Sequence, residues 1–426
     1  MEKLTQLIKN DMLPAFGVTE PGAIAFAVAS AKEHLCEEVI SVEVALNSGM
    51  YKNAFTCGIP NSSRYGNLYA AALGAVAARA DLGLESLTYI TPEDDEAAAL
   101  LVEQGKVKVW MDHIGSEITI DACVKSASES CTVHIRGSHT HIESIELNNE
   151  IIYEDTDITE SSEKAAEPVK PLIHEYTVSQ ILDYVNTVPF EEITFIRDAF
   201  KMNLELLDEG LNSNRAVIAA RLLAENDNKL FSDNPVSTAQ LLCNGAIEAR
   251  VLGLSRPAMS ITGSGAHGII ATMPLYAYYK TSNIPEETLL RATALSYLIC
   301  MYIKEYSGKL SAFCGCGIAA GTGMACGLAY MQGADDDKIN KVILNMSGGL
   351  TGMICDGGNH GCAMKGIVAT DAAFRAVSLA MNDAYIEGIH GINGLTPEDT
   401  MRNMGLIASP GMVQTEKTIV DIMEDK

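Results

Sequence analysis

Residues 118–136 read ITIDACVKSASESCTVHIR. Two apolar–polar alternations occupy this stretch: Ile118 and Ile120 recur with a period of two in its first part, and Cys131 and Val133 do so in its last part. A period of two places alternate side chains on opposite faces of a β-strand. The stretch therefore predicts strands of an antiparallel sheet that is buried on one face and solvated on the other.

The same pattern extends outward from this stretch. A period of two runs from 106 to 153, and Asn148-Asn149 is a good tight turn within it. On the N-terminal side, Ala-rich segments with a helical character replace the alternation. Helices are predicted at 22–35 and 66–82, and a strand-like segment with a hairpin turn at 47–49 is predicted at 38–57.

An acidic segment follows the strands. Residues 154–170, EDTDITESSEKAAEPVK, contain Ser and Pro but few large apolar side chains, which is typical of a linker. At 426 residues, the chain is also too long for one ordinary core. We therefore predict a domain at 1–155 that contributes loops to the substrate site, an acidic linker at 156–172, and a second domain at 173–426.

After the linker, nearly every segment is predicted to be helical. Ile193, Ile196, Phe200, Leu204 and Leu207 recur at spacings of 3 and 4, as on one face of a helix. The fold class is therefore α+β, with an antiparallel sheet in the N-terminal domain and a mostly α-helical C-terminal domain. Further helices are predicted at 236–252, 285–306, 317–333, 336–346, 363–382 and 414–424.

Charge and hydropathy exclude several classes of partner. The 30 basic and 55 acidic residues leave a net charge of −25, which repels phosphate backbones, so no nucleic acid is expected. The most apolar helical stretch, 289–303, contains Arg291 and is shorter than a bilayer requires, so no membrane span is expected. The N-terminus lacks the apolar region of a signal peptide, which predicts a cytoplasmic protein. A homodimer is a possible assembly.

The chain contains 11 cysteines, an odd number that argues against a disulfide framework. Most cysteines outside the segment 314–362 are predicted to be plain core residues, because their neighbours are apolar. Cys326, on a glycine-rich helix, is also predicted to face the core. The other cysteines assigned to the core are Cys36, Cys123, Cys243 and Cys300.

Three glycine-rich segments interrupt the helical half, at 260–268, 307–327 and 347–366. Glycine weakens helices, so its density here needs a reason. One interpretation is close helix–helix contact. The other is that the backbone approaches a cofactor, and the cysteines in two of the segments favour this second interpretation.

These cysteines have an unusual spacing. Cys355 and Cys362 are seven positions apart, which fits neither a zinc ribbon nor a thioredoxin motif. Cys314 and Cys316 precede a helix, where backbone N–H groups stabilise thiolates. Thiolates bind zinc, copper(I) or iron–sulfur clusters, and spacing alone also leaves core or redox thiols open.

Several motifs together resemble the L-cysteine desulfidase family, which is related to the catalytic α-chain of bacterial iron–sulfur L-serine dehydratases. The resemblance covers nearly the whole chain, and the ICDG…CAMK segment is its most specific part. The motifs are GVTEP at 17–21, YKN at 51–53, GIP at 58–60, SITGSG with His267, CGC…AAGTG, ICDG…CAMK, and PGMVQTEKTIVDIM near the C-terminus.

The resemblance implies a [4Fe–4S] cluster on three cysteines, with one iron left free. Cys355 and Cys362 match two of the ligands, and the third is either Cys314 or Cys316. The implied reaction is β-elimination from a small amino acid such as L-cysteine or L-serine, which gives a keto acid, ammonia, and sulfide or water. A free iron can act as a Lewis acid. No pyridoxal phosphate is expected.

The chain departs from the family pattern at two places. Val18 stands where the family commonly has a cysteine, so a base must come from elsewhere. The loop after GIP, usually small and glycine-rich, is polar here. Its residues are predicted substrate contacts, and Arg64 could bind a carboxylate bidentately. These residues are Asn61, Ser62, Ser63 and Arg64.

Further candidates follow from residue type. A histidine near its ordinary pKa suits proton abstraction, as does a desolvated lysine. The candidate bases are His267, Lys52, His360 and His141, of which His360 could instead orient a ligand and His141 could contact substrate. Glu20 could hold the substrate ammonium, and Ser264 could donate to its carboxylate. Each also has a structural interpretation, as a surface, capping or turn residue.

Two other function classes stand beside the lyase. A non-catalytic cluster- or metabolite-binding sensor derived from this family is one, and Val18 favours it. A zinc hydrolase is the other, although the chain lacks the His-Glu-x-x-His ligand pair.

Overall fold

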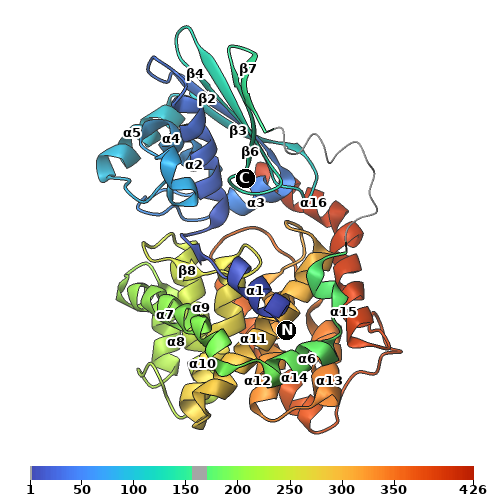
Figure 1. The fold of residues 1–426 in the computed structure, drawn as a ribbon. Coiled ribbons are helices and arrows are strands. Elements are labelled where there is room, and N and C mark those ends of the chain that lie inside the picture. The colour runs from blue at the N-terminus through green and yellow to red at the C-terminus, as the bar shows by residue number, and fades with distance from the viewer. Residues whose placement is uncertain (1, 156–169) are drawn as a thin grey trace.

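The computed structural model describes residues 2–155 and 170–426. Figure 1 shows two lobes, an upper one built around a β-sheet and a lower one built almost entirely of helices. The predicted α+β class is therefore confirmed. Most of the predicted acidic linker lies outside the described residues, and the domain boundaries stay a prediction.

The upper lobe contains a six-stranded sheet of strand order β3-β2-β4-β5-β6-β7. β2 and β3 are parallel, and the other neighbours are antiparallel, so the prediction of an antiparallel sheet is wrong at this edge. Parallel neighbours need a long crossover, and here helices supply it. The strands are β2 Ser41–Asn47, β3 Val107–His113, β4 Thr119–Lys125, β5 Ser130–Arg136, β6 Ile142–Leu147 and β7 Glu150–Glu154.

Helices cover one face of this sheet. Ile120, Ala122 and Val124 of β4 are buried towards them, whereas Cys123 points the other way and is only half-buried. The predicted core role of Cys123 is therefore wrong, because the period of two puts it on the outer face. The helices of this lobe are α2 Thr19–Lys32, α3 Ser48–Ala54, α4 Gly66–Val76 and α5 Pro92–Glu103.

Two turn predictions have different outcomes. Asn148 and Asn149 form the expected tight turn, with φ of +53° and +66°. The predicted hairpin turn at 47–49 is wrong, because Ser48 begins α3 and the chain continues as a helix. Cys36 is exposed in the turn after α2, so its predicted core role is also wrong.

In the lower lobe, residues 292–303 of α11 (Glu286–Ser307) are buried on every side. Cys243, Cys300 and Cys326 are fully buried in this core, as predicted. The apolar helix face predicted to begin at Ile193 does not lie in one α-helix. Ile193 and Ile196 belong to a 3₁₀ segment that precedes it. The helices are α1 Glu2–Asp11, α6 Val178–Thr187, α7 Arg197–Asn212, α8 Val217–Glu225, α9 Pro235–Val251, α10 Gly265–Ser282, α11 Glu286–Ser307, α12 Gly321–Met331, α13 Asp336–Leu350, α14 Gly361–Met381, α15 Pro397–Leu406 and α16 Val413–Glu424.

The terminal helices connect the lobes. α1 packs in the lower lobe, where Leu4 and Ile8 join its core. α16 packs against α3 of the upper lobe, where Val420 joins the smaller core. Figure 1 shows the N-terminus below and the C-terminus above, so each end of the chain belongs to the lobe distant from it in sequence.

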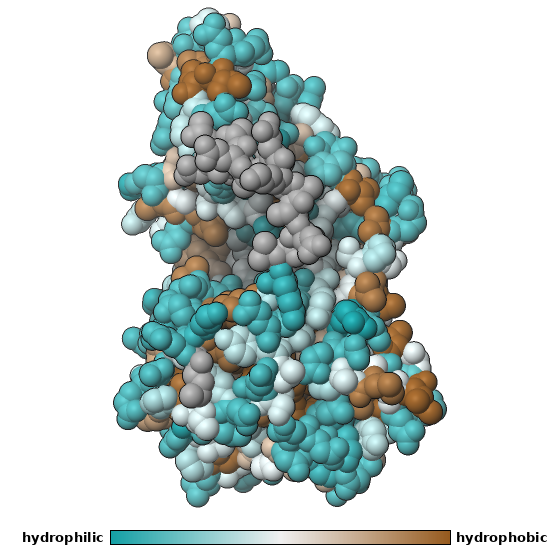
Figure 2. All heavy atoms as spheres, turned by 45° about the vertical axis from the view of Figure 1, so that its right-hand side comes forward, coloured by the Kyte–Doolittle hydropathy of each residue, from teal (hydrophilic) through white to brown (hydrophobic). Residues whose placement is uncertain are grey.

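The surface is largely polar. Figure 2 shows hydrophilic side chains over most of the face it presents, with hydrophobic ones between them in small groups. No helix within the described ranges is both long and apolar enough to cross a membrane.

Candidate active site

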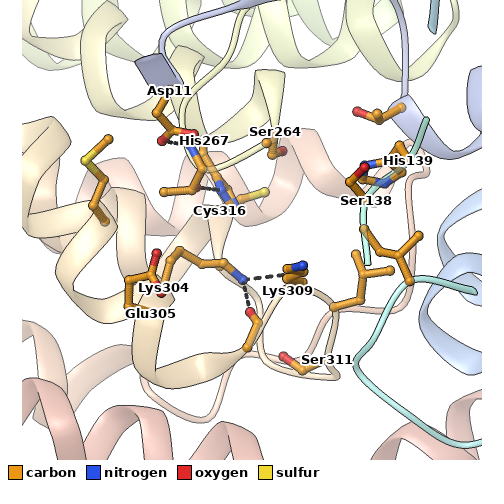
Figure 3. Close-up of a pocket in the computed structure, with 18 of the residues that line it drawn as sticks. Asp11, Ser138, His139, Ser264, His267, Lys304, Glu305, Lys309, Ser311 and Cys316 are labelled. Carbon is orange, nitrogen blue, oxygen red and sulfur yellow. Dashed lines mark hydrogen bonds between the residues drawn. The ribbon is translucent and has the colours of Figure 1, made fainter. Parts of the chain in front are cut away.

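A cavity of about 730 Å³ lies between the two lobes (Figure 3). The upper lobe contributes the first turn of α2 and the loop between β5 and β6, and the lower lobe contributes the start of α10 and the end of α11. A cavity of this size with convergent polar groups is typical of a small-molecule site. A smaller cavity of about 80 Å³ adjoins it, and both are lined by Glu20, Asn53, Arg250, Ser264, Cys316 and Cys355.

The four predicted ligands line the smaller cavity: Cys314, Cys316, Cys355 and Cys362. Cys314 and Cys355 come together because their segments pair as a short antiparallel ladder. Its N–H···O bonds measure 3.0 Å from Cys314 to Met353 and 2.6 Å from Cys355 to Ala312. Cys362 lies in the first turn of α14. Two segments of the chain thus present their thiols to one space.

These thiols differ in how easily they ionise. The pKa of Cys314 is lowered, because its sulfur accepts hydrogen bonds from the Cys316 thiol and from the Gly317 N–H. The pKa of Cys316 is raised, because its thiol is the donor in this pair and is buried. Burial raises the pKa of Cys362 to about 11. Because metals bind the thiolate, and because the Gly317 N–H donates to the Cys314 sulfur at 3.5 Å, Cys314 suits that role better than Cys316.

Glycines serve two purposes in the cysteine segments. A Cβ on Gly315 would lie 2.7 Å from Nε2 of His267 and 3.1 Å from Cδ of Lys304, so glycine lets these side chains approach the thiol loop. Gly323 of α12, by contrast, packs against the carbonyl oxygen of Ser296 on α11. Gly323 thus confirms the interpretation of close helix–helix contact, and the approach of the backbone to a cofactor stays a prediction.

The start of α2 reaches the thiols. Val18 is the N-cap residue, and its Cγ1 lies 3.0 Å from the place of a Cβ on Gly358. Glu20 is buried in the first turn and accepts a hydrogen bond of 2.8 Å from Nδ2 of Asn53. Val18 and Glu20 both line the smaller cavity.

His139 lines the larger cavity, although its sequence context does not single it out. Its Nε2 lies 4.0 Å from Oε1 of Glu20 and has no hydrogen-bond partner among the described residues. Burial lowers the pKa of this imidazole. The predicted contact His141 instead pairs with Asp155 at 2.8 Å and lines neither cavity. Only the shape of the β5–β6 loop decides which histidine reaches the site.

His267 and Lys304 face the larger cavity side by side with Cys316 (Figure 3). Nδ1 of His267 lies 2.5 Å from the hydroxyl of Thr262. Burial, together with nearby Lys304 and Arg250, holds the pKa of His267 well below its ordinary value, so its imidazole is neutral. Burial also lowers the pKa of Lys304. Lys304 is a titratable cavity residue that the sequence does not reveal.

Lys52 lies beneath the site rather than in it. Its Nζ donates to Oε2 of Glu416 at 2.9 Å and to the carbonyl oxygens of Ser311 and Cys355 at 2.9 and 3.1 Å. Burial alone would lower the pKa of Lys52, but Cys355 and Glu416 more than offset this and raise it. Lys52 is therefore a cation that ties α16 to the Cys355 loop, and its contacts suit positioning better than proton transfer.

Replacing Lys52 by methionine should destabilise the protein strongly. The Lys52→Met change leaves the Glu416 carboxylate buried without a counter-charge, which costs about 3–5 kcal/mol in the free energy of unfolding. Urea denaturation measures this cost. The double change Lys52→Met with Glu416→Leu removes both charges and should recover most of the lost stability. The control is Lys417→Met, at an exposed ion pair, which should lower the free energy of unfolding by less than about 1 kcal/mol. Equal stability of Lys52→Met and wild type would contradict this role.

The polar loop predicted to contact substrate lines neither cavity. Asn61 donates to backbone carbonyls just before α5. The hydroxyls of Ser62 and Ser63 donate to the carboxylate of Asp95 on α5, and Nε of Arg64 lies 4.0 Å from the same group. The loop is thus folded onto α5, and this position argues against its predicted contacts with substrate.

His360 also points away from the two cavities. Its Nε2 bonds Oε1 of Glu248 at 2.7 Å, and its side chain is 46% exposed. The buried Glu248 in turn accepts from the N–H groups of Ile218 and Ala219 at the start of α8. His360 therefore supports a helix terminus. Ser264 lines both cavities, and its contact with substrate stays a prediction.

Comparison with known proteins identifies the family of this chain. The family model described as serine dehydratase alpha chain matches residues 81–421, which include all four thiols. A UPF0597 protein of Clostridium botulinum (strain Okra / Type B1) is 38% identical over 99% of this chain and 98% of its own length. UPF0597 proteins of Clostridioides difficile (strain 630) and of Caldanaerobacter subterraneus subsp. tengcongensis are 33% and 36% identical, over 99% of this chain and 99% and 98% of their own lengths. The chain belongs to the serine dehydratase alpha chain family.

Proposed function

We propose that this protein is an iron–sulfur-dependent lyase, of the cysteine desulfidase or serine dehydratase type, that carries out β-elimination on a small amino acid. One observation carries the proposal. Four thiols from two segments line a single cavity together with the buried Glu20 and Ser264, and this cavity joins a larger one that can admit substrate. The family relationship adds support.

The residues of the smaller cavity fit a cluster. Across residues 2–155 and 170–426, no three His, Cys, Asp or Glu side chains are set around a single ion, but a cluster binds each thiolate at a different iron and draws ligands from separate loops. Cys355, Cys362 and Cys314 would hold it. Positive charge lies close by, because Lys365 lines the smaller cavity. Burial would lower the pKa of Lys365, but its ion pair with Asp356, and to a smaller extent nearby Cys362 and Cys355, raise it. When bound, the cluster supplies a Lewis-acidic iron that polarises the leaving group.

The side chains around the cavity can carry the remaining steps. The Glu20 carboxylate, oriented by Asn53, holds the substrate ammonium. The neutral His267 imidazole accepts the α-proton as the Cα–H electron pair forms the Cα=Cβ bond and hydroxide or sulfide leaves Cβ. The resulting aminoacrylate tautomerises and hydrolyses to a keto acid and ammonia. Thr262 fixes the ring of His267 through its hydrogen bond to Nδ1.

Anaerobic reconstitution with iron and sulfide, followed by a screen of small amino acids for keto-acid release, tests the proposal. L-Serine and L-cysteine are the first substrates to compare. Release of pyruvate with ammonia, dependent on iron, is the expected result. A protein that holds its cluster but turns over none of these amino acids would contradict the lyase.

Activity should also be sensitive to oxygen. An iron without a protein ligand is open to oxidants, and Cys316 and Cys355 line the larger cavity between the lobes as well as the smaller one. Exposure of the reconstituted protein to air should therefore abolish turnover, and anaerobic treatment with iron and reductant should restore it. Full activity in aerated, iron-free protein would exclude this mechanism.

Val18 favours a second candidate function. It lines the thiol cavity without a titratable group, where the related family commonly has a cysteine. A cluster- or metabolite-binding sensor without turnover would be consistent with this position. Binding of amino acids with no product release from the reconstituted protein would identify that case.

A further inference from the structure

Arg250 is a buried cation without an ion-pair partner within residues 2–155 and 170–426. It lies in the last turn of α9, it is 6% exposed, and it lines both the larger and the smaller cavity. Among the described residues its guanidinium has no ion pair, and its Nε has no hydrogen-bond partner. A buried charge is costly unless it is paired. An anion that enters the cavity would supply the missing partner.

The start of α10 lies directly against this guanidinium. A Cβ on Gly265 would lie 2.7 Å from Nε of Arg250, so glycine permits the close approach. Ser264 is the N-cap residue, but its side chain accepts no bond from the first turn. The first N–H groups of a helix have no intrahelical acceptor, and the helix dipole favours an anion there. The guanidinium and the helix terminus thus favour a negative charge at the same place.

A negative group of the protein stands elsewhere in the same small cavity. Glu20 lines it together with Arg250 and Ser264, and the thiols of Cys355 and Cys362 border the same space. A ligand that satisfies both charges must carry a carboxylate at one end and a cation at the other. An α-amino acid zwitterion has this pattern, whereas a hydroxy acid leaves Glu20 without a counter-charge.

We propose that Arg250 and the N-terminus of α10 form the subsite for the α-carboxylate of an amino acid whose ammonium lies at Glu20. This subsite deepens the proposed function, because the bound amino acid would be the substrate of the elimination. Binding itself does not require that reaction. Arg250 thus has the carboxylate-binding role that the sequence suggests for Arg64. The side chain of Arg64 instead lies beside Asp95 of α5. The guanidinium can bind the carboxylate bidentately.

Calorimetric titration of the anaerobically reconstituted protein with L-alanine tests the subsite, because L-alanine keeps both charges but has no leaving group. L-Alaninamide lacks the carboxylate charge, and L-lactate lacks the ammonium. Each should bind wild-type protein roughly tenfold more weakly than L-alanine, or weaker still. This comparison needs no variant, so it stands even if a substitution at α9 impairs folding.

Variants give the second readout. Arg250→Gln should weaken L-alanine binding roughly 10- to 100-fold, and Arg250→Lys should lose less. Arg256→Gln, at an exposed position just beyond α9, is the matched control and should bind as wild type does. Equal affinity for L-alanine and L-alaninamide, unchanged binding in Arg250→Gln, or no binding of L-alanine to wild type would overturn the subsite.

The two proposals can fail separately. If L-alanine binds in the expected way but no amino acid is turned over, the subsite stands and the elimination reaction fails. If keto acid is released and Arg250→Gln leaves KM unchanged, the elimination stands and the subsite is wrong.

Discussion

Replacing either Cys355 or Cys362 by serine should abolish the broad visible absorbance of the anaerobically purified protein. Both thiols line the cavity on which the proposed cluster site rests, and the cluster would need one thiolate from each side of the loop. A serine hydroxyl is a far weaker iron ligand than a thiolate. Absorbance spectra and iron content of the purified variants measure the loss.

The matched control for these variants is Cys326→Ser. Cys326 is fully buried on α12 and lines neither cavity, so a folded Cys326→Ser protein should keep its iron and its spectrum. Equal loss of cluster in that variant would show that the assignment of ligands is wrong. Within the pair Cys314 and Cys316, substitution of Cys314 should cause the greater loss, because the Gly317 N–H donates to its sulfur and so favours the thiolate there.

His267→Ala should lower turnover by roughly 100-fold or more, the usual effect of losing a general base. The cluster spectrum should be unchanged, since His267 is not among the proposed ligands. Exchange of the substrate α-hydrogen with solvent deuterium should fall in parallel with turnover. His390→Ala, at an exposed loop position, is the control and should behave as wild type.

The pH dependence of stability gives an independent check on His267. Its folded-state pKa lies well below that of an unfolded histidine, about 6.5. The unfolded state therefore binds the extra proton first, and the contribution of His267 to stability is lost as pH falls below about 6.5. That part of the acid-side loss should be absent in His267→Ala. Normal turnover and normal exchange in the variant would remove His267 from the mechanism, and the neighbouring Lys304 would become the next candidate.

Local patterns in the sequence were sufficient for most of the secondary structure. The alternation at 118–136 yields β4 and β5, and the predicted helix at 236–252 is α9 within one residue at each end. Side-chain periodicity depends only on near neighbours, and helix starts depend on local capping chemistry. The parallel edge formed by β2 and β3 was missed, because strand pairing is decided by the helices that pack between distant segments.

The sequence by itself also determined which chemistry is available. The motifs alone predicted that the thiols, Val18 and Glu20 belong to one site. These motifs are the cysteines and glycines at 314–316 and 355–362 and the segment 17–21. The structure gathers the same residues around one cavity. This inference needs no coordinates, for two reasons. Thiolates bind only a few kinds of metal, and residues of a family motif can be matched by sequence alone.

Only the tertiary structure decided which polar side chains reach that cavity. Arg250 looks like an ordinary helix residue in sequence, yet α10 packs across α9 and leaves its guanidinium buried, with no ion pair in the part of the chain that the structure describes. Arg64 has the more suggestive context, but its loop is folded onto Asp95. His139 rather than His141 faces the site for a similar reason. The direction of a side chain depends on long-range packing between the lobes, and no local pattern encodes it.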